Sequence, residues 1–204
     1  MSEQATSLDL DGVIFSRPPI QITAVFGYML HGNGIYEPVR NLSDMERSVV
    51  DEPITSFFEK RSYKTHASRK LAPDAHQFIE QEANERDIYG NTGRRNKKNW
   101  VDMTKQTLDD EKVLRFFKDF FFKPKGVRTV ESKGAAISQL LKRYKNVKHV
   151  DDNPADVLPL AKIFPMVQFF IVQDLTTGLL FSRIEIKEYP NVKRVPRLLS
   201  AVLK

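Results

Sequence analysis

The chain has 204 residues, of which 41% are apolar and 28% are charged, and its formal net charge is +6. This length suits one domain, or one domain with a modest insertion, and the charged fraction is ordinary for a soluble protein. Because the sequence contains no cysteine, it excludes disulfide bonds and thiolate zinc sites.

The distribution of apolar and charged residues indicates a cytoplasmic protein that does not bind a membrane. The first ten residues are polar and acidic, unlike a secretory signal, and no apolar run approaches the ~20 residues of a membrane helix. The positive charge is uneven, with 16 Lys and Arg against 6 Asp and Glu between Gly93 and Lys148. Such a stretch attracts phosphorylated metabolites, nucleic acid or anionic lipid, although scattered lysines more often form an ordinary solvated surface.

The N-terminal part of the chain predicts strand-like segments followed by an irregular region. Residues 5–10 and 13–15 are strand-like and bracket two aspartates. Residues 17–70 are rich in turn signals and carry little regular periodicity. We therefore expect 17–70 to form a small insertion, with 1–16 and 71–204 forming the core domain.

Beyond the insertion, predicted helices and strands alternate along the chain. Helices are predicted over 73–85 and 97–107, from an N-cap at Ser132 to Tyr144, from the pair Asn153-Pro154 and from Pro196, and strands over 87–92, 120–123, 146–150, 166–172 and 183–189. This alternation predicts an α/β fold with a doubly wound, mostly parallel sheet.

Residues capable of chemistry gather at the predicted strand ends, which is where ligands bind in such sheets. They are Asp9 and Asp11 after the first strand, Thr92, Asp151 and Asp152 at later strand ends, Lys133 opening a helix, and Asp156 one helical turn beyond Asp152. Several carboxylates near one point require a hard cation, and oxygen ligands suit Mg²⁺. A hydroxyl and a lysine beside them suit a bound phosphate.

These motifs, taken in order, resemble those of the haloacid dehalogenase-like (HAD) hydrolases, most of which are Mg²⁺-dependent phosphatases. The matching segments are DLDGV at 9–13, IYGNTGR at 88–94, SKGAAI at 132–137 and DDNPAD at 151–156. Each motif alone has an ordinary explanation, such as a surface turn or an acidic helix start. All four in the family's order make the resemblance specific.

The resemblance implies a Rossmann-like core and a phosphatase that works through an aspartyl-phosphate. Asp9 would be the nucleophile, and Asp11 would protonate the leaving alcohol and then deprotonate the attacking water. Thr92 and Lys133 would hold the phosphoryl oxygens and offset charge in the transition state.

The resemblance also implies a binding set around these four catalytic residues. Gly12, Gly93 and Arg94 would lie against the substrate. Mg²⁺ would be held by the Asp9 carboxylate, the Asp11 backbone carbonyl and Asp152, with Asp151 and Asp156 assisting directly or through water. Which of Asp151 and Asp152 is the inner ligand stays open, and the family pattern favours Asp152.

Three functions follow as alternatives. The leading one is a phosphomonoester hydrolase acting on a small phosphorylated metabolite or nucleotide, with 17–70 in the place of the family's cap. A short cap and the basic stretch favour a second, a phosphatase acting on a macromolecule such as a nucleic-acid end or a phosphoprotein. The third is a non-catalytic module that binds a phosphorylated ligand. The sequence makes no prediction of oligomeric state.

Overall fold

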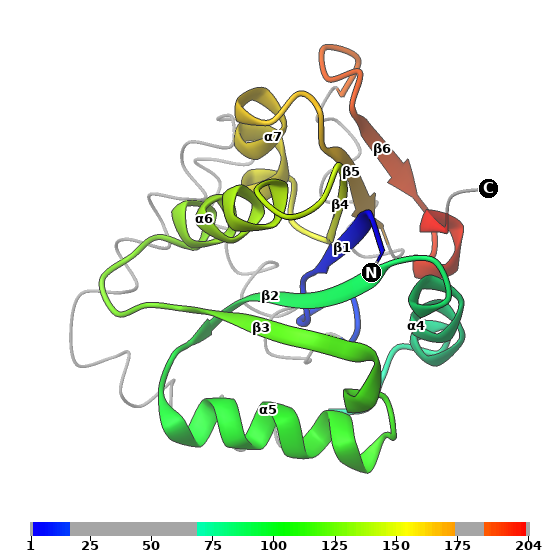
Figure 1. Ribbon diagram of the computed structural model, residues 1–204, viewed down its shortest axis with the longest axis vertical. Helices are drawn as coiled ribbons and strands as arrows, with labels where there is room; N and C mark the ends of the chain where they lie inside the picture. The colour runs from blue at the N-terminus through cyan, green and yellow to red at the C-terminus, as the bar shows by residue number, and fades with distance from the viewer. Residues whose placement is uncertain (1, 17–68, 174–185, 203–204) are drawn as a thin grey trace, which may run out of the picture.

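The fold is a six-stranded parallel sheet with helices on both faces (Figure 1). It is described by a computed structural model that covers residues 2–16, 69–173 and 186–202. The strands, in the sheet order β3-β2-β1-β4-β5-β6, are β3 (Phe117–Lys123), β2 (Asp87–Arg95), β1 (Gln4–Leu8), β4 (Asn146–Asp151), β5 (Gln168–Val172) and β6 (Val192–Val195). The predicted doubly wound α/β fold is confirmed.

The helices divide between the two faces of the sheet. They are α4 (Ala75–Ala83), α5 (Lys98–Asp110), α6 (Thr129–Leu141), α7 (Pro154–Ile163) and the 3₁₀ helices η1 (Leu114–Phe116) and η2 (Leu198–Ala201). Helices α6 and α7 cover one face, while α4 and η2 cover the other (Figure 1). Among the described residues, no helix has both the length and the apolar character that crossing a membrane requires.

The central strands are buried on both faces because successive side chains point into opposite layers. On β4, Val147 joins the apolar cluster beneath α6 and α7, whereas Val150 joins the cluster beneath α4. On β5, Phe169 and Phe170 divide in the same way. The chain moves outward from β1 to β2 and β3 and then crosses to β4 on the other side of β1, so the switch point of the sheet lies at β1.

A buried ion pair ties the C-terminal end of the chain to the face covered by α4. The Lys148 ammonium lies 2.7 Å from Glu82 and donates to the carbonyl of Ala201 at 2.9 Å. The Thr6 hydroxyl donates to the other Glu82 oxygen at 2.7 Å. Burial lowers the pKa of Lys148, while the Glu82 charge opposes that shift. The pair therefore joins β1, β4, α4 and η2 through groups that satisfy one another.

The start of α6 differs from the prediction. The sequence predicts that Ser132 caps a helix that Lys133 opens, but α6 begins at Thr129. The Glu131 carboxylate accepts the backbone N–H of Arg128 at 3.4 Å, which closes the helix N-terminus one turn earlier. Lys133 is consequently buried within the helix rather than placed at its end.

The C-terminal edge of the sheet also differs from the prediction. The sequence predicts a strand over 183–189, but residues 186–189 contain a turn, and 183–185 lie outside the described residues. The edge strand is β6, which pairs in parallel with β5. The helix predicted from Pro196 is only the short η2.

The two ends of the predicted insertion lie side by side. The backbone N–H of Ser16 donates to the carbonyl of Lys70 at 3.1 Å, and the N–H of Ala72 donates to Ile14 at 2.8 Å. Residues 17–68 lie outside the described residues, so the predicted insertion stays a prediction. The hydrogen bonds nevertheless place residues 69–72 beside the loop that follows β1.

We expect Gly90→Ala to destabilise the fold because β2 and β3 approach closely at this position. A Cβ on Gly90 would lie 2.3 Å from Cδ1 of Phe120. Overpacking of this kind costs about 1–3 kcal/mol, which equilibrium urea unfolding can measure. Adding Phe120→Leu should recover part of the loss, and an unchanged free energy of unfolding in Gly90→Ala would contradict the close approach.

Candidate active site

The first strand carries Asp9 to the carboxyl edge of the sheet at its switch point. The backbone N–H of Asp9 donates to the carbonyl of Val150 at 2.9 Å, so the β1–β4 ladder continues past the end of β1. Asp151 and Asp152 end the neighbouring strand β4 or follow it directly. The parallel pairing of β1 with β4 therefore places carboxylates that are far apart in sequence at one edge.

A tight turn follows Asp9, where the sequence predicts a strand-like segment over 13–15. Residues 13–15 form no strand but belong to a turn in which the N–H of Phe15 donates to the carbonyl of Leu10 at 2.8 Å. Gly12 has a φ of 85°, a conformation that other residues rarely adopt. The glycine therefore allows the chain to leave the strand sharply.

Lys133 lies at the centre of a buried carboxylate cluster. Its ammonium nitrogen is 2.7 Å from Asp151, 2.9 Å from Asp156 and 3.6 Å from Asp9. At most 8% of any of these four side chains is exposed. Because α6, β4, α7 and the end of β1 each supply one member, the cluster forms only when the sheet is assembled.

Burial and charge shift the pKa values of the groups in contact with Lys133. Burial alone would lower the pKa of Lys133, but Asp151, Asp156 and Asp9 outweigh it and raise the pKa well above its usual value. Burial alone would raise the pKa of Asp151, but Lys133 and a hydrogen bond from His149 hold it well below its usual range. Lys133 and Asp151 therefore form the firmly ionised pair of the cluster.

The pKa values of Asp9 and Asp156 shift upward, in the opposite direction to that of Asp151. Burial raises the pKa of Asp9 well above its usual value, and the charges of Asp151, Asp152 and Asp11 add to the shift that Lys133 opposes. Burial also raises the pKa of Asp156. One lysine thus does not balance the carboxylates around it.

Three of the carboxylates are close enough to share one metal ion. One oxygen from each of Asp9, Asp151 and Asp152 lies within 4.8 Å of the other two. Oδ1 of Asp9 is buried and has no hydrogen-bond partner among the described residues. A buried carboxylate oxygen without a donor is costly, so this atom is a natural cation ligand.

Asp11 pairs with arginine side chains instead of Lys133. Nε and Nη2 of Arg94 donate to its two oxygens at 2.9 and 2.7 Å, which is a bidentate pair. Nη1 of Arg94 donates to the Thr104 hydroxyl at 2.7 Å, and the guanidinium lies 4.8 Å from the centre of the Phe15 ring. Nη1 of Arg69 also donates to Asp11. The two aspartates of the first motif are therefore held apart by separate cations.

A buried hydrogen-bond network connects Asn91 to Asp151 of the cluster. The Asn91 amide nitrogen can only donate and the Asp151 carboxylate accepts, which sets the direction of the bonds between them. The Asn91 amide donates to the backbone carbonyl of Lys133 at 3.3 Å and to the Ser7 hydroxyl at 3.0 Å. Ser7 can then donate to Nδ1 of His149 at 2.9 Å, which leaves Nε2–H to donate to Asp151 at 3.1 Å. His149 thus orients Asp151.

The structure brings some predicted residues together and only locates others. Asp9, Lys133, Asp151, Asp152 and Asp156 form one cluster, and Asp11 and Arg94 form an ion pair beside it. The Thr92 hydroxyl accepts the N–H of Arg94 at 3.1 Å. For Gly12 and Gly93, the described contacts establish a place at this edge of the sheet and nothing more.

Sequence reasoning missed Arg69, Ser7, Asn91 and His149 as parts of the site. The spacing of His149 and Asp151 was a usable signal, because residues two apart on a strand face the same layer. No local pattern marks Arg69, since it follows an irregular segment.

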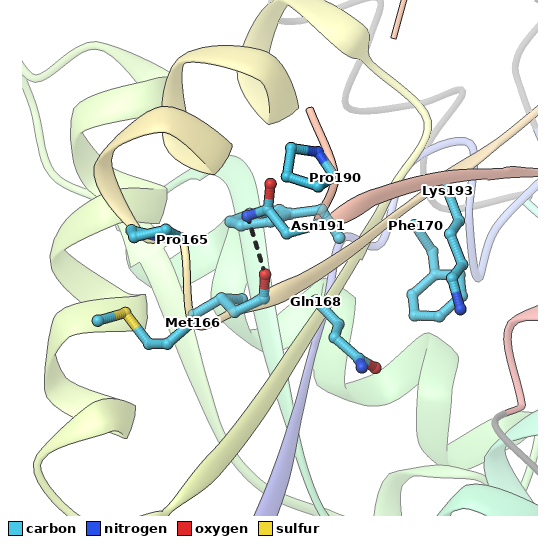
Figure 2. Close-up of a pocket in the computed structure, with 9 residues that line it drawn as sticks. Pro165, Met166, Gln168, Phe170, Pro190, Asn191 and Lys193 are labelled. Carbon is cyan, nitrogen blue, oxygen red and sulfur yellow. Dashed lines mark hydrogen bonds between the residues drawn. The ribbon is translucent and has the colours of Figure 1, made fainter. Parts of the chain in front are cut away.

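A hollow of about 330 Å³ lies at the opposite end of the sheet, among Pro165, Met166, Gln168, Pro190 and Lys193 (Figure 2). The Asn191 amide lines the hollow and donates hydrogen bonds to carbonyls at the end of α7 and in the segment between α7 and β5. None of the predicted site residues lines this hollow. It is therefore separate from the carboxylate cluster.

We expect Asp9→Asn to stabilise the metal-free protein. Because folding raises the pKa of Asp9, its ionised form opposes folding in a way that a neutral amide does not. At neutral pH the gain should be seen as a higher melting temperature for Asp9→Asn in a chelator. The difference should vanish below the pKa of Asp in the unfolded chain and grow as the pH rises toward the folded value. A lower melting temperature for Asp9→Asn would contradict this.

Comparisons with known proteins identify the fold. No model of a known protein family matches the sequence, and no curated protein matches it. Several solved structures match along nearly their whole length, and three represent them. CbbY from Rhodobacter sphaeroides, in complex with phosphate, has a TM-score of 0.60 at 12% identity, covering 98% of this chain and 96% of that one.

Magnesium-bound YfnB from Bacillus subtilis, a HAD-hydrolase, has a TM-score of 0.57 at 12% identity, with 98% and 97% of the two chains covered. The L-2-haloacid dehalogenase from Xanthobacter autotrophicus, with chloropropionic acid covalently bound, has a TM-score of 0.55 at 16% identity, with 98% and 96% covered. The strand order and the carboxyl-edge cluster described above agree with the resemblance of the sequence motifs. The chain therefore has the fold of the haloacid dehalogenase-like hydrolases.

Proposed function

We propose that this protein is a Mg²⁺-dependent phosphomonoester hydrolase that forms an aspartyl-phosphate on Asp9. The observation that carries the proposal is the convergence of Asp9, Asp151 and Asp152 beside the buried ammonium of Lys133. A site that combines a cation-binding carboxylate group with a fixed positive charge suits a ligand with several anionic oxygens. We infer a small phosphorylated metabolite or nucleotide as substrate.

The residues present fit a magnesium ion. Asp9 offers a buried oxygen that lacks a hydrogen-bond partner among the described residues. Asp151 already accepts hydrogen bonds from Lys133, His149 and the backbone of Asn153. This favours Asp9 and Asp152 as the inner carboxylate ligands, with the Asp11 backbone carbonyl completing the set and Asp151 and Asp156 supporting it. When bound, the ion would offset negative charge on the phosphoryl oxygens.

The same carboxylate cluster favours phosphoryl transfer over dehalogenation. Structural neighbours include a phosphate complex and a magnesium complex, but also a dehalogenase. Displacement of a halide at carbon forms one halide monoanion, whereas phosphoryl transfer takes place on a group that already carries several anionic oxygens. Three converging carboxylates that call for such a cation are better explained by a phosphoryl substrate.

The proposed chemistry assigns each residue a separate task. The Asp9 carboxylate attacks phosphorus in line with the departing alcohol, which forms the acyl phosphate and breaks the ester P–O bond. Asp11 supplies a proton to that alcohol and later removes one from the water that cleaves the acyl phosphate. The Lys133 ammonium and the Thr92 hydroxyl hold the phosphoryl oxygens.

A basic rim beside the site favours the second candidate, a substrate that is the phosphorylated end of a nucleic acid. The rim follows the carboxyl ends of β2 and β3 and consists of Arg95, Lys97, Lys98, Lys123, Lys125 and Arg128. Lys98 and Lys125 are exposed. A nucleic-acid backbone would bring several phosphates to such a rim at once.

The primary test is release of inorganic phosphate from a panel of phosphomonoesters with Mg²⁺ and with a chelator. We expect metal-dependent release, and a loss of about 10³-fold or more in Asp9→Asn because it removes the nucleophile. Asp102→Asn, which changes an exposed carboxylate on α5, is the matched control and should keep full activity. Turnover that persists in Asp9→Asn would overturn the assignment, and binding without turnover in the unaltered protein would favour the non-catalytic module.

The second candidate predicts a salt effect that depends on the substrate. The KM for an oligonucleotide with a terminal phosphate should rise steeply with NaCl, whereas the KM for p-nitrophenyl phosphate should change little. Neutralising the rim in Lys98→Gln/Lys125→Gln should flatten the oligonucleotide dependence. Lys142→Gln/Arg143→Gln removes two exposed charges from the opposite end of α6 and serves as control. Equal salt dependence for both substrates would exclude this candidate.

A further inference from the structure

Arg69 carries two hydrogen-bond donors that have no partner among the described residues. Only 3% of its side chain is exposed, and Nη1 donates to Asp11. Nε and Nη2 are buried and have no hydrogen-bond partner among the described residues. Leaving buried charged donors without acceptors is costly, so native proteins rarely do so unless another molecule completes them.

Arg69 lies beside the candidate active site. Its Nη1 donates to Asp11, and the charges of Asp11, Arg94, Asp9 and Asp152 act on its guanidinium. The hydrogen bond between Ser16 and the neighbouring Lys70 fixes this part of the chain beside the loop that carries Asp11.

A comparison of the two arginines on Asp11 shows what Arg69 lacks. Arg94 uses Nε and Nη2 to bind both oxygens of Asp11 side-on, and Nη1 to bind Thr104. In Arg69 the Nη1 donor binds Asp11, while the side-on pair of Nε and Nη2 meets no acceptor in the described part of the chain. That pair has the spacing of two oxygens on one carboxylate or phosphate group.

We propose that Arg69 binds an oxyanion of the substrate side-on through Nε and Nη2, while Nη1 keeps its bond to Asp11. The inference deepens the proposed function, on which it rests only for the identity of the anion as part of a phosphoester. The oxyanion is either the reacting phosphoryl group or a second anionic group of the same substrate. In both cases Arg69 connects substrate binding to the position of Asp11.

The test measures anion binding separately from turnover. Calorimetry with inorganic phosphate and Mg²⁺ should show affinity about 10- to 100-fold weaker in Arg69→Ala when Arg69 holds the phosphoryl group. Arg69→Lys keeps the charge but not the side-on pair, so its affinity should fall between those of the other two. Arg115→Gln removes an exposed guanidinium beside the opposite end of β3 and should bind phosphate normally.

Two esters distinguish the sources of the anion. For p-nitrophenyl phosphate and 2-phosphoglycolate alike, KM should rise together with the phosphate Kd if Arg69 holds the reacting group. A rise confined to 2-phosphoglycolate, with phosphate binding unchanged, would assign Arg69 to a second anionic group. If the phosphate Kd and both KM values are unchanged in Arg69→Ala, the inference is wrong.

The outcome is separable from that of the proposed function. Phosphate binding that depends on Arg69 in a protein that hydrolyses no ester would uphold the anion site and reject the phosphatase. Hydrolysis by Arg69→Ala with an unchanged KM and an unchanged phosphate Kd would reject the anion site and uphold the phosphatase. Circular dichroism melting of each variant establishes that it is folded, and Arg69→Lys carries the comparison where Arg69→Ala does not fold.

Discussion

The Lys133 ammonium is the counter-charge on which the arrangement of the site depends. Without it, Asp9, Asp151 and Asp156 would be buried carboxylates with no nearby cation, and burial of that kind is strongly unfavourable. Lys133 lies in the second turn of α6, which begins beyond the carboxyl end of β3. A lysine from this helix thus meets carboxylates from β1, β4 and α7 at one edge of the sheet.

The topology explains why these segments are the ones that meet. Strand β1 lies between β2 and β4, so the ends of the strands carrying Asp9, Thr92 and Asp151 are adjacent although they are far apart in the chain. The face of the sheet that α4 covers contains the Lys148–Glu82 pair. This pair is equally buried, but its ammonium and carboxylate groups are hydrogen-bonded to each other, to Thr6 and to Ala201. The contrast is informative, because the structural ion pair is satisfied internally whereas Oδ1 of Asp9, 3.6 Å from the Lys133 ammonium, accepts no hydrogen bond from the described residues.

Much of this could be predicted from the sequence, because the polar residues follow strand-like runs in the order of a doubly wound sheet. The failures share a physical cause, since they occur where tertiary contacts override local pattern. Ser132 resembles a cap, but Glu131 closes the helix earlier. The strand VKRV is short and half charged, and pairing with β5 makes it a strand. Arg69 is recruited by Asp11 from an irregular segment, and no local periodicity could reveal that contact.

Two features of the site point to the same two ligands, a cation and an oxyanion. These features are its charges and the atoms of Asp9 and Arg69 that have no hydrogen-bond partner among the described residues. Five carboxylates, Asp9, Asp11, Asp151, Asp152 and Asp156, face three cationic side chains, Lys133, Arg69 and Arg94. Burial raises the pKa of Asp9 and of Asp156, and neighbouring carboxylates add to both shifts. Oδ1 of Asp9 has no hydrogen-bond partner among the described residues and lies 3.6 Å from the Lys133 ammonium, so a divalent ion bound there would offset negative charge that one lysine does not balance. An oxyanion near Nε and Nη2 of Arg69 would then meet a neutral rather than a repelling site, so cation binding should precede anion binding.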